Sequence, residues 1–290
     1  EQVTNILGFR ELEDEGKVMC MADYSLPIPD EKNKFIDFFS VNGIELKAKF
    51  PVLNMYSKIS SVAWNHPREH VAYMAQRVLE KNMGELFSNA IDKTGIRNVC
   101  WAGGVASNVK ANMKIRLLPQ LRRWFVFPHM GDGGLAAGAA LYVSNMLFST
   151  KAYAIDNVYF GPEFSGNAIE NAIKAVKNDY NISYEYRNDI SEYAADLISK
   201  GNYLFWFQGR MEYGPRALGN RSIVAPAGSE KVKDLINLYV KKREWYQPFC
   251  PSVLDIDAKR FFHNVDMNNP DKFMTNAYEA IQGRIHRIKS

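Results

Sequence analysis

The sequence predicts an α/β protein with two domains, on three observations. Two short apolar strands are each followed by a glycine turn and a helix, and repeated units of this kind build a largely buried sheet. The chain has 290 residues, enough to bury two cores, and is 47% hydrophobic and 23% charged, as is usual for globular proteins. A polar stretch at about Ser149–Asp156 divides it. We therefore expect domains at residues 1–148 and 152–290.

The composition narrows the class of protein. The formal net charge is +4, too small to predict a nucleic-acid partner. Three distant cysteines without a Cys-x-x-Cys motif indicate a reducing compartment; they are Cys20, Cys100 and Cys250. We find no signal peptide, and the best apolar run, Leu135–Phe148, is too short to span a membrane. We expect a cytoplasmic protein with no membrane partner, and leave open whether it forms a homo-oligomer.

The first domain opens with weak strand signals and one clear helix. Residues 35–50 alternate loosely and predict one or two strands, and Pro67–Lys93 has the apolar spacing of a helix. His66 and His70 have the spacing of a metal-binding pair. Because Pro67 places His66 at or before the helix start, and no carboxylate is close in sequence, we interpret both histidines as solvated.

The first strand–turn–helix unit is a candidate nucleotide site. The predicted strand Asn98–Ala102 leads into Gly103-Gly104 and a helix from about Val105. A helix start presents free N–H groups to a phosphate. Asn108 and Asn112 lie on one face of this helix and could hydrogen-bond a ribose or a base. A glycine pair can equally be a simple chain reversal.

The second unit repeats the pattern 28 residues later, counted from Gly103 to Gly131. A strand at Trp124–Phe127 precedes the turn Gly131-Asp132-Gly133-Gly134, and an alanine-rich helix follows at Leu135–Met146. Asp132 could bind a metal ion that bridges phosphates. It could instead cap the helix.

The second domain begins with alternating elements. The pattern predicts a strand at Val158–Gly161, helices at Asn167–Lys177 and Ile190–Lys200, and a buried strand at Tyr203–Phe207. A further helix, Glu230–Lys242, has an acidic start and a basic end, which suits the helix dipole.

The segment Phe207–Ser222, here called the arginine loop, is the strongest candidate site. Its glycines punctuate a tight turn, and they alternate with Arg210, Arg216, Arg221 and a single counter-charge, Glu212. Glycine lets backbone N–H groups reach an anion, and arginine holds a phosphate or carboxylate in a two-pronged fork. The alternative is a surface loop whose arginines pair with acids elsewhere.

One further cation could join the arginine loop. Asn237 and Lys241 are four residues apart and would share a helix face. If that face turns toward the loop, Lys241 adds a fourth positive charge. If it does not, Lys241 is an ordinary solvated lysine.

Three motifs resemble one enzyme family. Residues 209–222, Gly-Arg-Met-Glu-Tyr-Gly-Pro-Arg-Ala-Leu-Gly-Asn-Arg-Ser, resemble the signature of the nodulation-type O-carbamoyltransferases, which include antibiotic carbamoyltransferases. Residues 102–112 resemble their nucleotide-binding strand–helix element, and Gly131–Gly134 resembles their Gly-Asp-Ala-Gly turn. The resemblance covers nearly all of this chain but only a middle portion of the family's length. Together with the initial Glu1, it indicates a fragment lacking both ends.

The resemblance implies a fold and a chemistry. Residues 1–148 would be the second half of an actin-like ATPase domain, of the kind found in the tRNA threonylcarbamoyl-transfer protein. Residues 152–290 would be a truncated YrdC-like domain. ATP and carbamoyl phosphate would give carbamoyl-adenylate, and a small-molecule hydroxyl acceptor would receive the carbamoyl group.

The resemblance also implies roles for individual residues. Arg216, Arg221 and Lys241 would be catalytic, and Asp132 would bind a divalent metal, Fe or Mg. The residues that would bind ATP or carbamoyl phosphate are Gly103, Gly104, Asn108, Gly131, Gly133, Arg210, Ser222, Asn237 and Arg243. The family's metal-binding histidines come from a motif that this chain lacks, so the metal site would be incomplete.

Departures from the family pattern keep rival functions open. Residues 20–25 lack the family's glycines and proline, and Gln247 replaces an arginine. One rival is a threonylcarbamoyl-transfer or hydrogenase-maturation enzyme, although the small basic excess and the missing zinc-finger cysteines argue against these. The other is an inactive nucleotide-binding scaffold.

Overall fold

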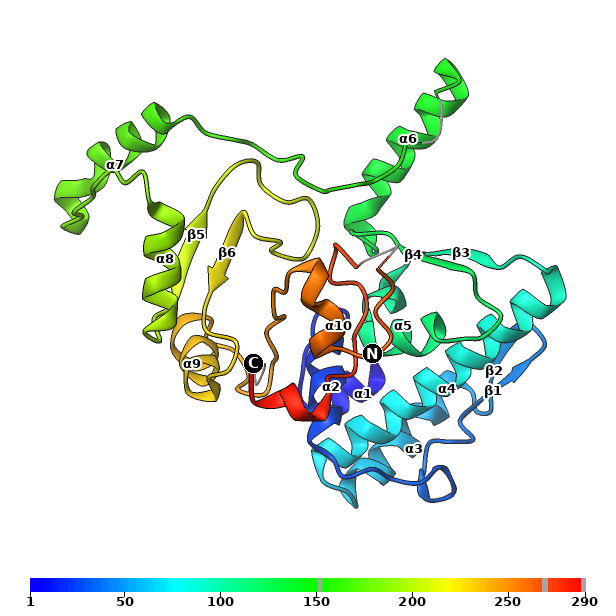
Figure 1. Ribbon diagram of the computed structural model, residues 1–290. Coiled ribbons are helices and arrows are strands. Elements are labelled where there is room, and N and C mark those ends of the chain that lie inside the picture. The colour runs from blue at the N-terminus through cyan, green and yellow to red at the C-terminus, as the bar shows by residue number, and fades with distance from the viewer. Residues whose placement is uncertain (151–152, 268–270, 288–290) are drawn as a thin grey trace.

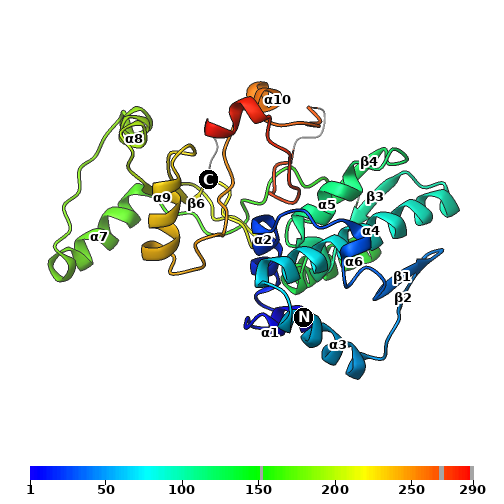
Figure 2. The same ribbon diagram turned by 90° about the horizontal axis from the view of Figure 1, so that it is seen from below.

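The computed structural model describes residues 1–150, 153–267 and 271–287, and it shows a mixed α/β protein with two lobes. Figure 1 and Figure 2 place α1 to α5 and β1 to β4 in the first lobe, and α7 to α9 with β5 and β6 in the second. Helix α6 projects from the first lobe in Figure 1. The class predicted from the sequence, α/β, is confirmed.

The first lobe is mainly helical. Its elements are α1 (Gln2–Ile6), α2 (Glu15–Met21), β1 (Phe39–Asn42), β2 (Glu45–Ala48), α3 (Val52–Trp64), α4 (Arg68–Thr94), β3 (Asn98–Trp101), α5 (Val109–Arg116), β4 (Arg123–Val126) and α6 (Leu135–Phe148). Helix α4 begins directly after Pro67 and ends at Gly95, whose φ is +69° and whose N–H donates to the Ile91 carbonyl. Proline at a helix start and glycine just after its end are the boundaries that the backbone favours.

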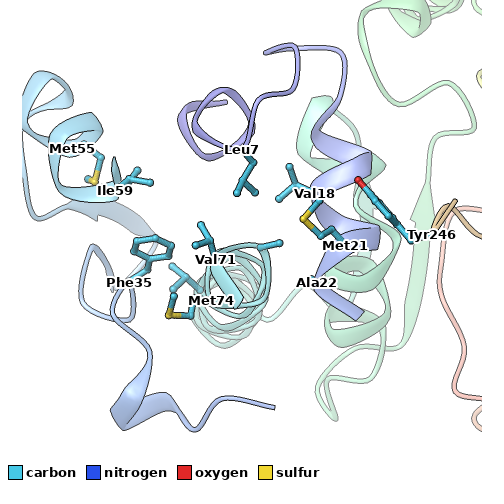
Figure 3. Packing of buried hydrophobic residues seen from close by; sticks show 12 residues of the cluster. Leu7, Val18, Met21, Ala22, Phe35, Met55, Ile59, Val71, Met74 and Tyr246 are labelled. Atoms are coloured by element: carbon cyan, nitrogen blue, oxygen red, sulfur yellow. The ribbon is translucent and has the colours of Figure 1, made fainter. Parts of the chain in front are cut away.

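One apolar core holds the first lobe together and includes a residue from far along the chain. Its buried side chains come from α1 to α4 and the intervening loops, and they include Leu7, Val18, Met21, Phe35, Met55, Ile59, Val71 and Met74. Tyr246, which lies far along the sequence from these elements, is only 7% exposed and completes this core beside Val18 and Met21 (Figure 3). The two lobes therefore share buried apolar surface.

The two strand–turn–helix units lie side by side. Strands β3 and β4 pair in parallel, with Asn98 opposite Arg123 and Trp101 opposite Val126. A second apolar cluster, which includes Met83, Ile115 and Trp124, packs beneath them. Because parallel strands end at the same edge of a sheet, both glycine turns meet there.

The second lobe is built around one antiparallel strand pair. Its elements are α7 (Gly166–Tyr180), α8 (Ile190–Ser199), β5 (Leu204–Phe207), β6 (Arg221–Val224), α9 (Glu230–Leu235) and a π turn (Ile236–Val240). Helix α10 (Ala258–Phe261) follows them in the sequence. Phe207 pairs with Arg221, so the arginine loop is the connection between the ends of β5 and β6.

Four local predictions were wrong. Strand β5 is not buried, since Phe205 and Phe207 on its outer face are 71% and 53% exposed. Residues 158–161 form no strand, although Val158 and Gly161 bond to the backbone of the arginine loop. The helix expected from Val105 begins at Val109, after a single 3-10 turn. Among the described residues the sheets have two strands each, and β3 alternates between exposed and half-buried residues, so the largely buried sheet that we expected is absent there.

The last described segment returns to the first lobe. The Ala277 N–H donates to the Val109 carbonyl at 3.0 Å, at the start of α5. The Trp124 ring N–H donates to Asn276 Oδ1 at 2.9 Å. Residues 271–278 therefore lie over the helix that follows the first glycine turn.

No helix among the described residues has both the length and the apolar character that a membrane span requires.

Candidate functional site

Two glycine turns meet at the edge of the β3–β4 sheet. The Gly103 N–H donates to the Met130 carbonyl at 2.7 Å, which joins the first turn to the residue before Gly131. Gly103 has a φ of +110°, a conformation that residues with a Cβ rarely adopt. The candidates Gly103, Gly104, Gly131 and Gly133 thus form one continuous edge.

The arginine loop reaches this edge from the second lobe. The Tyr213 hydroxyl donates to the Gly133 carbonyl at 2.9 Å, and the two residues are 80 apart in sequence. Gly214, with a φ of +124°, lies against Pro128; a Cβ built on Gly214 would stand 3.5 Å from the Pro128 carbonyl oxygen. Figure 1 shows the loop between β5 and β6 extending toward the base of α6. The structure thus brings two separately predicted sites into contact.

The backbone N–H groups of the arginine loop bind a carboxylate of the loop itself. Glu212 is 7% exposed, and its Oε1 accepts bonds from the N–H groups of Leu218 and Asn220 at 2.7 Å and of Arg221 at 3.2 Å. Burial alone would raise the pKa of Glu212, but these N–H groups hold it below its ordinary value. In this structure Glu212 therefore occupies three of the N–H groups of the loop.

Ser222 closes the same part of the arginine loop. Its Oγ accepts the Gly219 N–H at 2.9 Å. In this structure Ser222 therefore supports the loop.

Arg221 is engaged within the loop. Its NH1 donates to the Gln208 and Asn220 carbonyls at 2.7 and 2.9 Å, and its NH2 lies 3.3 and 3.2 Å from the Pro162 and Gly209 carbonyls. The guanidinium also stacks 3.6 Å from the centre of the Phe207 ring. This geometry makes Arg221 a clamp on the loop backbone.

Arg216 differs from the other arginines of the loop. It is half-buried, and within the part of the chain that the structure describes its guanidinium has no hydrogen-bond or ion-pair partner. Arg210, by contrast, is exposed and donates to the Phe160 carbonyl at 3.2 Å. Arg216 is therefore the loop cation best able to bind an external anion.

Two arginines affect the thiol of Cys20 through their charges. Burial raises the pKa of the Cys20 thiol to about 11, Asp23 adds to this rise, and the positive charges of Arg216 and Arg243 oppose it. Cys20 lies in α2 of the first lobe. Lys110 of α5, which forms an ion pair with Asp23, also lowers the pKa of the Cys20 thiol, as the two arginines do.

Asn237 and Lys241 do not share a face. Asn237 is fully buried and its side chain bonds to the Trp245 and Gln247 carbonyls and to Arg243 Nε, at 3.0, 2.8 and 2.7 Å. Lys241 is exposed and ends a π turn, in which its N–H bonds to Ile236 five residues back. The prediction assumed α-helical spacing, and the wider π turn rotates the two side chains apart.

The asparagines predicted to bind a nucleotide have partners within the protein. Asn108 caps α5 by accepting the Ala111 N–H at 2.9 Å, and its amide exchanges two hydrogen bonds with Gln76. Asn112 is fully buried and donates to the Ala106 and Thr275 carbonyls. Both positions support the turn and the helix start in this structure.

Asp132 is exposed and its side chain caps neither the 3-10 turn it begins nor α6. Its carboxylate is therefore available as a hard oxygen ligand. Yet no group of three or more His, Cys, Asp or Glu side chains suited to a metal ion occurs in residues 1–150, 153–267 and 271–287. The described residues alone do not build a metal site at Asp132, nor at His66 and His70.

Two residues of the junction were missed by the sequence reasoning. His129 lies against the second turn: a Cβ built on Gly133 would stand 2.1 Å from its ring atoms. The rings of His129 and Tyr213 have centroids 5.1 Å apart. Tyr213, placed between two glycine-rich segments of the motif, offered a signal, because a large side chain there must pack against something outside the loop.

The site is suited to one class of protein. An α/β protein in which an arginine-rich loop meets two glycine turns has the groups that can bind an anionic ligand. The family follows from comparison with known proteins. The family model for the carbamoyltransferase N-terminus matches residues 2–141, and that for the carbamoyltransferase C-terminus matches residues 195–290. The chain belongs to the carbamoyltransferase family.

Three relatives illustrate the match. The nodulation protein NolNO of Sinorhizobium fredii is 37% identical over 90% of this chain and 39% of its own length. The nodulation protein NolO of Bradyrhizobium diazoefficiens is 35% identical over 90% of this chain and 49% of its own length. An uncharacterised protein of Methanocaldococcus jannaschii is 36% identical over 89% of this chain and 44% of its own. The chain thus spans less than half the length of these relatives.

Proposed function

We propose that this chain is part of an ATP-dependent O-carbamoyltransferase and that Arg216 holds an anionic group of the substrates. The observation that supports this most strongly is the free Arg216 guanidinium, in a loop whose N–H groups at Leu218, Asn220 and Arg221 are filled by Glu212. Glu212 fixes the shape of the loop from within, so one cation can be held ready for a phosphate. Membership of the carbamoyltransferase family supports the reaction class.

The proposed reaction has two steps. Water first cleaves carbamoyl phosphate to carbamate and phosphate; a carbamate oxygen then attacks the α-phosphorus of ATP and displaces pyrophosphate, which gives carbamoyl-adenylate. In the second step an acceptor hydroxyl attacks the carbamoyl carbon, loses its proton and displaces AMP. Both steps move negative charge on phosphate oxygens, which a fixed guanidinium stabilises in a partly dry site.

The residues divide into those that contact substrate and those that hold the site. Arg216 would contact the phosphate or carbamate oxygens, with Lys241, Arg210 and Arg243 as further cations. Arg221 would act mainly by fixing the loop, given its four carbonyl contacts. ATP would lie along the glycine edge beside Gly103 and Gly133. Asp132 would be one ligand of a divalent metal, with other ligands from the rest of the protein; such an ion polarises phosphate oxygens.

The test measures carbamoyl-phosphate-dependent release of pyrophosphate from ATP by the complete protein. We expect Arg216→Ala to reduce kcat/KM about 100-fold to 1000-fold, as the loss of one charge-stabilising donor does. Arg187→Ala is the control, since Arg187 pairs with Glu185 and Asp189 far from the loop; it should be unchanged. Normal release by Arg216→Ala would refute the role of Arg216. A folded protein that binds ATP without any release would favour a nucleotide-binding scaffold.

A further inference from the structure

The Tyr213 side chain joins the arginine loop to the Gly131–Gly134 turn. Its hydroxyl donates to the Gly133 carbonyl at 2.9 Å, and its ring lies at 58° to the His129 ring. The backbone of Tyr213 belongs to the second lobe, where its N–H donates to the Val158 carbonyl at 2.6 Å. A residue fixed in one lobe thus holds a carbonyl of the other.

We propose that Tyr213 is a positioning residue that couples the arginine loop to the Gly131–Gly134 turn, so that an anion bound by Arg216 changes the state of the turn that carries Asp132. This inference rests on the proposed function, because it assigns the anion to Arg216.

On the loop side, Arg216 lies between two points tied to one carboxylate. Glu212 precedes Tyr213 directly, and its Oε1 holds the N–H groups of Leu218 and Asn220. The hydrogen bond from the Leu218 N–H to Glu212 closes residues 212–218 into a ring, and Arg216 is one of the residues of this ring. A movement of Arg216 toward a ligand strains this ring, and the strain acts on the backbone of Glu212 and Tyr213.

On the side of the Gly131–Gly134 turn, His129 packs tightly against the backbone, which leaves little space for the turn to move independently. A Cβ on Gly133 would stand 2.1 Å from the His129 ring, and a Cβ on Gly134 would stand 2.0 Å from the His129 carbonyl oxygen. Close-packed groups of this kind shift together. Because Asp132 precedes Gly133, a pull on the Gly133 carbonyl reorients the Asp132 backbone.

Two sites are coupled only if the protein has two states in which the contacts of the ligands differ. Here the difference is the position of the Tyr213 hydroxyl relative to the Gly133 carbonyl, with and without an anion on Arg216. By reciprocity, a ligand that fixes Asp132 should also tighten anion binding at Arg216.

The experiment measures amide hydrogen exchange of residues 131–135 in the complete protein, with and without inorganic pyrophosphate as the probe. We expect pyrophosphate to slow this exchange at least threefold in the wild type. Tyr213→Phe should bind pyrophosphate within about threefold of wild-type affinity, since Arg216 is intact, but show no slowing in the turn. A general loss of stability would speed exchange everywhere without removing the response to the probe.

Tyr159→Phe is the matched control. The Tyr159 hydroxyl also donates to a carbonyl at 2.9 Å, that of Leu218 in the same loop, but it makes this bond within the second lobe. This variant should keep the wild-type response. If Tyr213→Phe also keeps it, the coupling proposal is overturned.

A second pair of variants keeps the two proposals separable. Arg216→Ala should abolish pyrophosphate binding; unchanged binding would overturn the proposed role of Arg216. If the wild type itself does not bind pyrophosphate, the proposed function fails. Exchange without the probe then tests whether Tyr213 holds the turn: residues 131–135 should exchange at least threefold faster in Tyr213→Phe than in Tyr159→Phe. Equal rates overturn the coupling. Gly133→Ala, which displaces His129 from the turn side, should mimic Tyr213→Phe if the latter fails to fold.

Discussion

Glu212 determines the conformation of the arginine loop through one oxygen atom. Three backbone N–H groups converge on Oε1, and the side chain is 7% exposed. Hydrogen bonds to a buried charged group are stronger than those between neutral groups, and an unpaired N–H in the same place would be costly. The motif's acid therefore has a structural explanation that needs no substrate.

We expect Glu212→Gln to lower the free energy of unfolding by about 1.5–3 kcal/mol at pH 7, since the amide keeps the shape but loses the charge. The difference should depend on pH. The pKa of Glu212 is lowered in the folded protein, so its stabilisation is complete above the unfolded value near 4.3 and is lost as pH falls through the folded value. Denaturant unfolding of both proteins from pH 7 to pH 3 measures this. A difference that stays constant to pH 3 would contradict the charge-based explanation.

At the scale of elements, the sequence patterns predicted most of the helices and strands whose formation depends on neighbouring residues. The strands β3 and β4, the helix α4 and the helices α6 to α8 lie close to their predicted ranges, because apolar spacing and glycine or proline boundaries act within a few residues. The π turn after α9 was not predictable, because its sequence is compatible with α-helix and its geometry depends on buried Asn237. The approach of the loop to Gly133 spans 80 residues and has no local signal.

The turn before α6 gives a prediction at this scale. Gly134→Ala should destabilise the protein by at least about 2 kcal/mol, because the new methyl group would meet the His129 carbonyl oxygen, which is backbone and cannot rotate away. Gly138→Ala, one turn into α6, has open space around it and should stabilise by about 0.5–1 kcal/mol. Thermal and denaturant unfolding compare the two. Equal effects of the two substitutions would show that the turn is looser than described.

At the scale of the whole molecule, Tyr246 joins the two lobes. Its ring is buried in the first-lobe core and contacts Tyr24 and Trp245 edge to face. Its hydroxyl is buried and has no hydrogen-bond partner among the described residues, and burial raises its pKa. A buried hydroxyl without a hydrogen-bond partner destabilises the folded state, and the packing of the ring must compensate for this.

We expect Tyr246→Phe to raise the free energy of unfolding by about 1 kcal/mol, because it removes the unpaired hydroxyl and keeps the packing. Tyr56→Phe is the comparison, since its exposed hydroxyl donates to Asn5 Oδ1 at 3.1 Å and its loss should be neutral or slightly destabilising. Unfolding monitored by circular dichroism separates the two. A clear loss of stability in Tyr246→Phe would mean that its hydroxyl is bonded after all.

The position of Tyr246 has a consequence for synthesis on the ribosome. The ring that covers Val18 and Met21 is synthesised more than 220 residues after them, after the whole β5–β6 hairpin. Until then the growing chain exposes an unfinished apolar surface, which is where nascent proteins aggregate or recruit chaperones. Completion of the first lobe therefore waits for translation of the second.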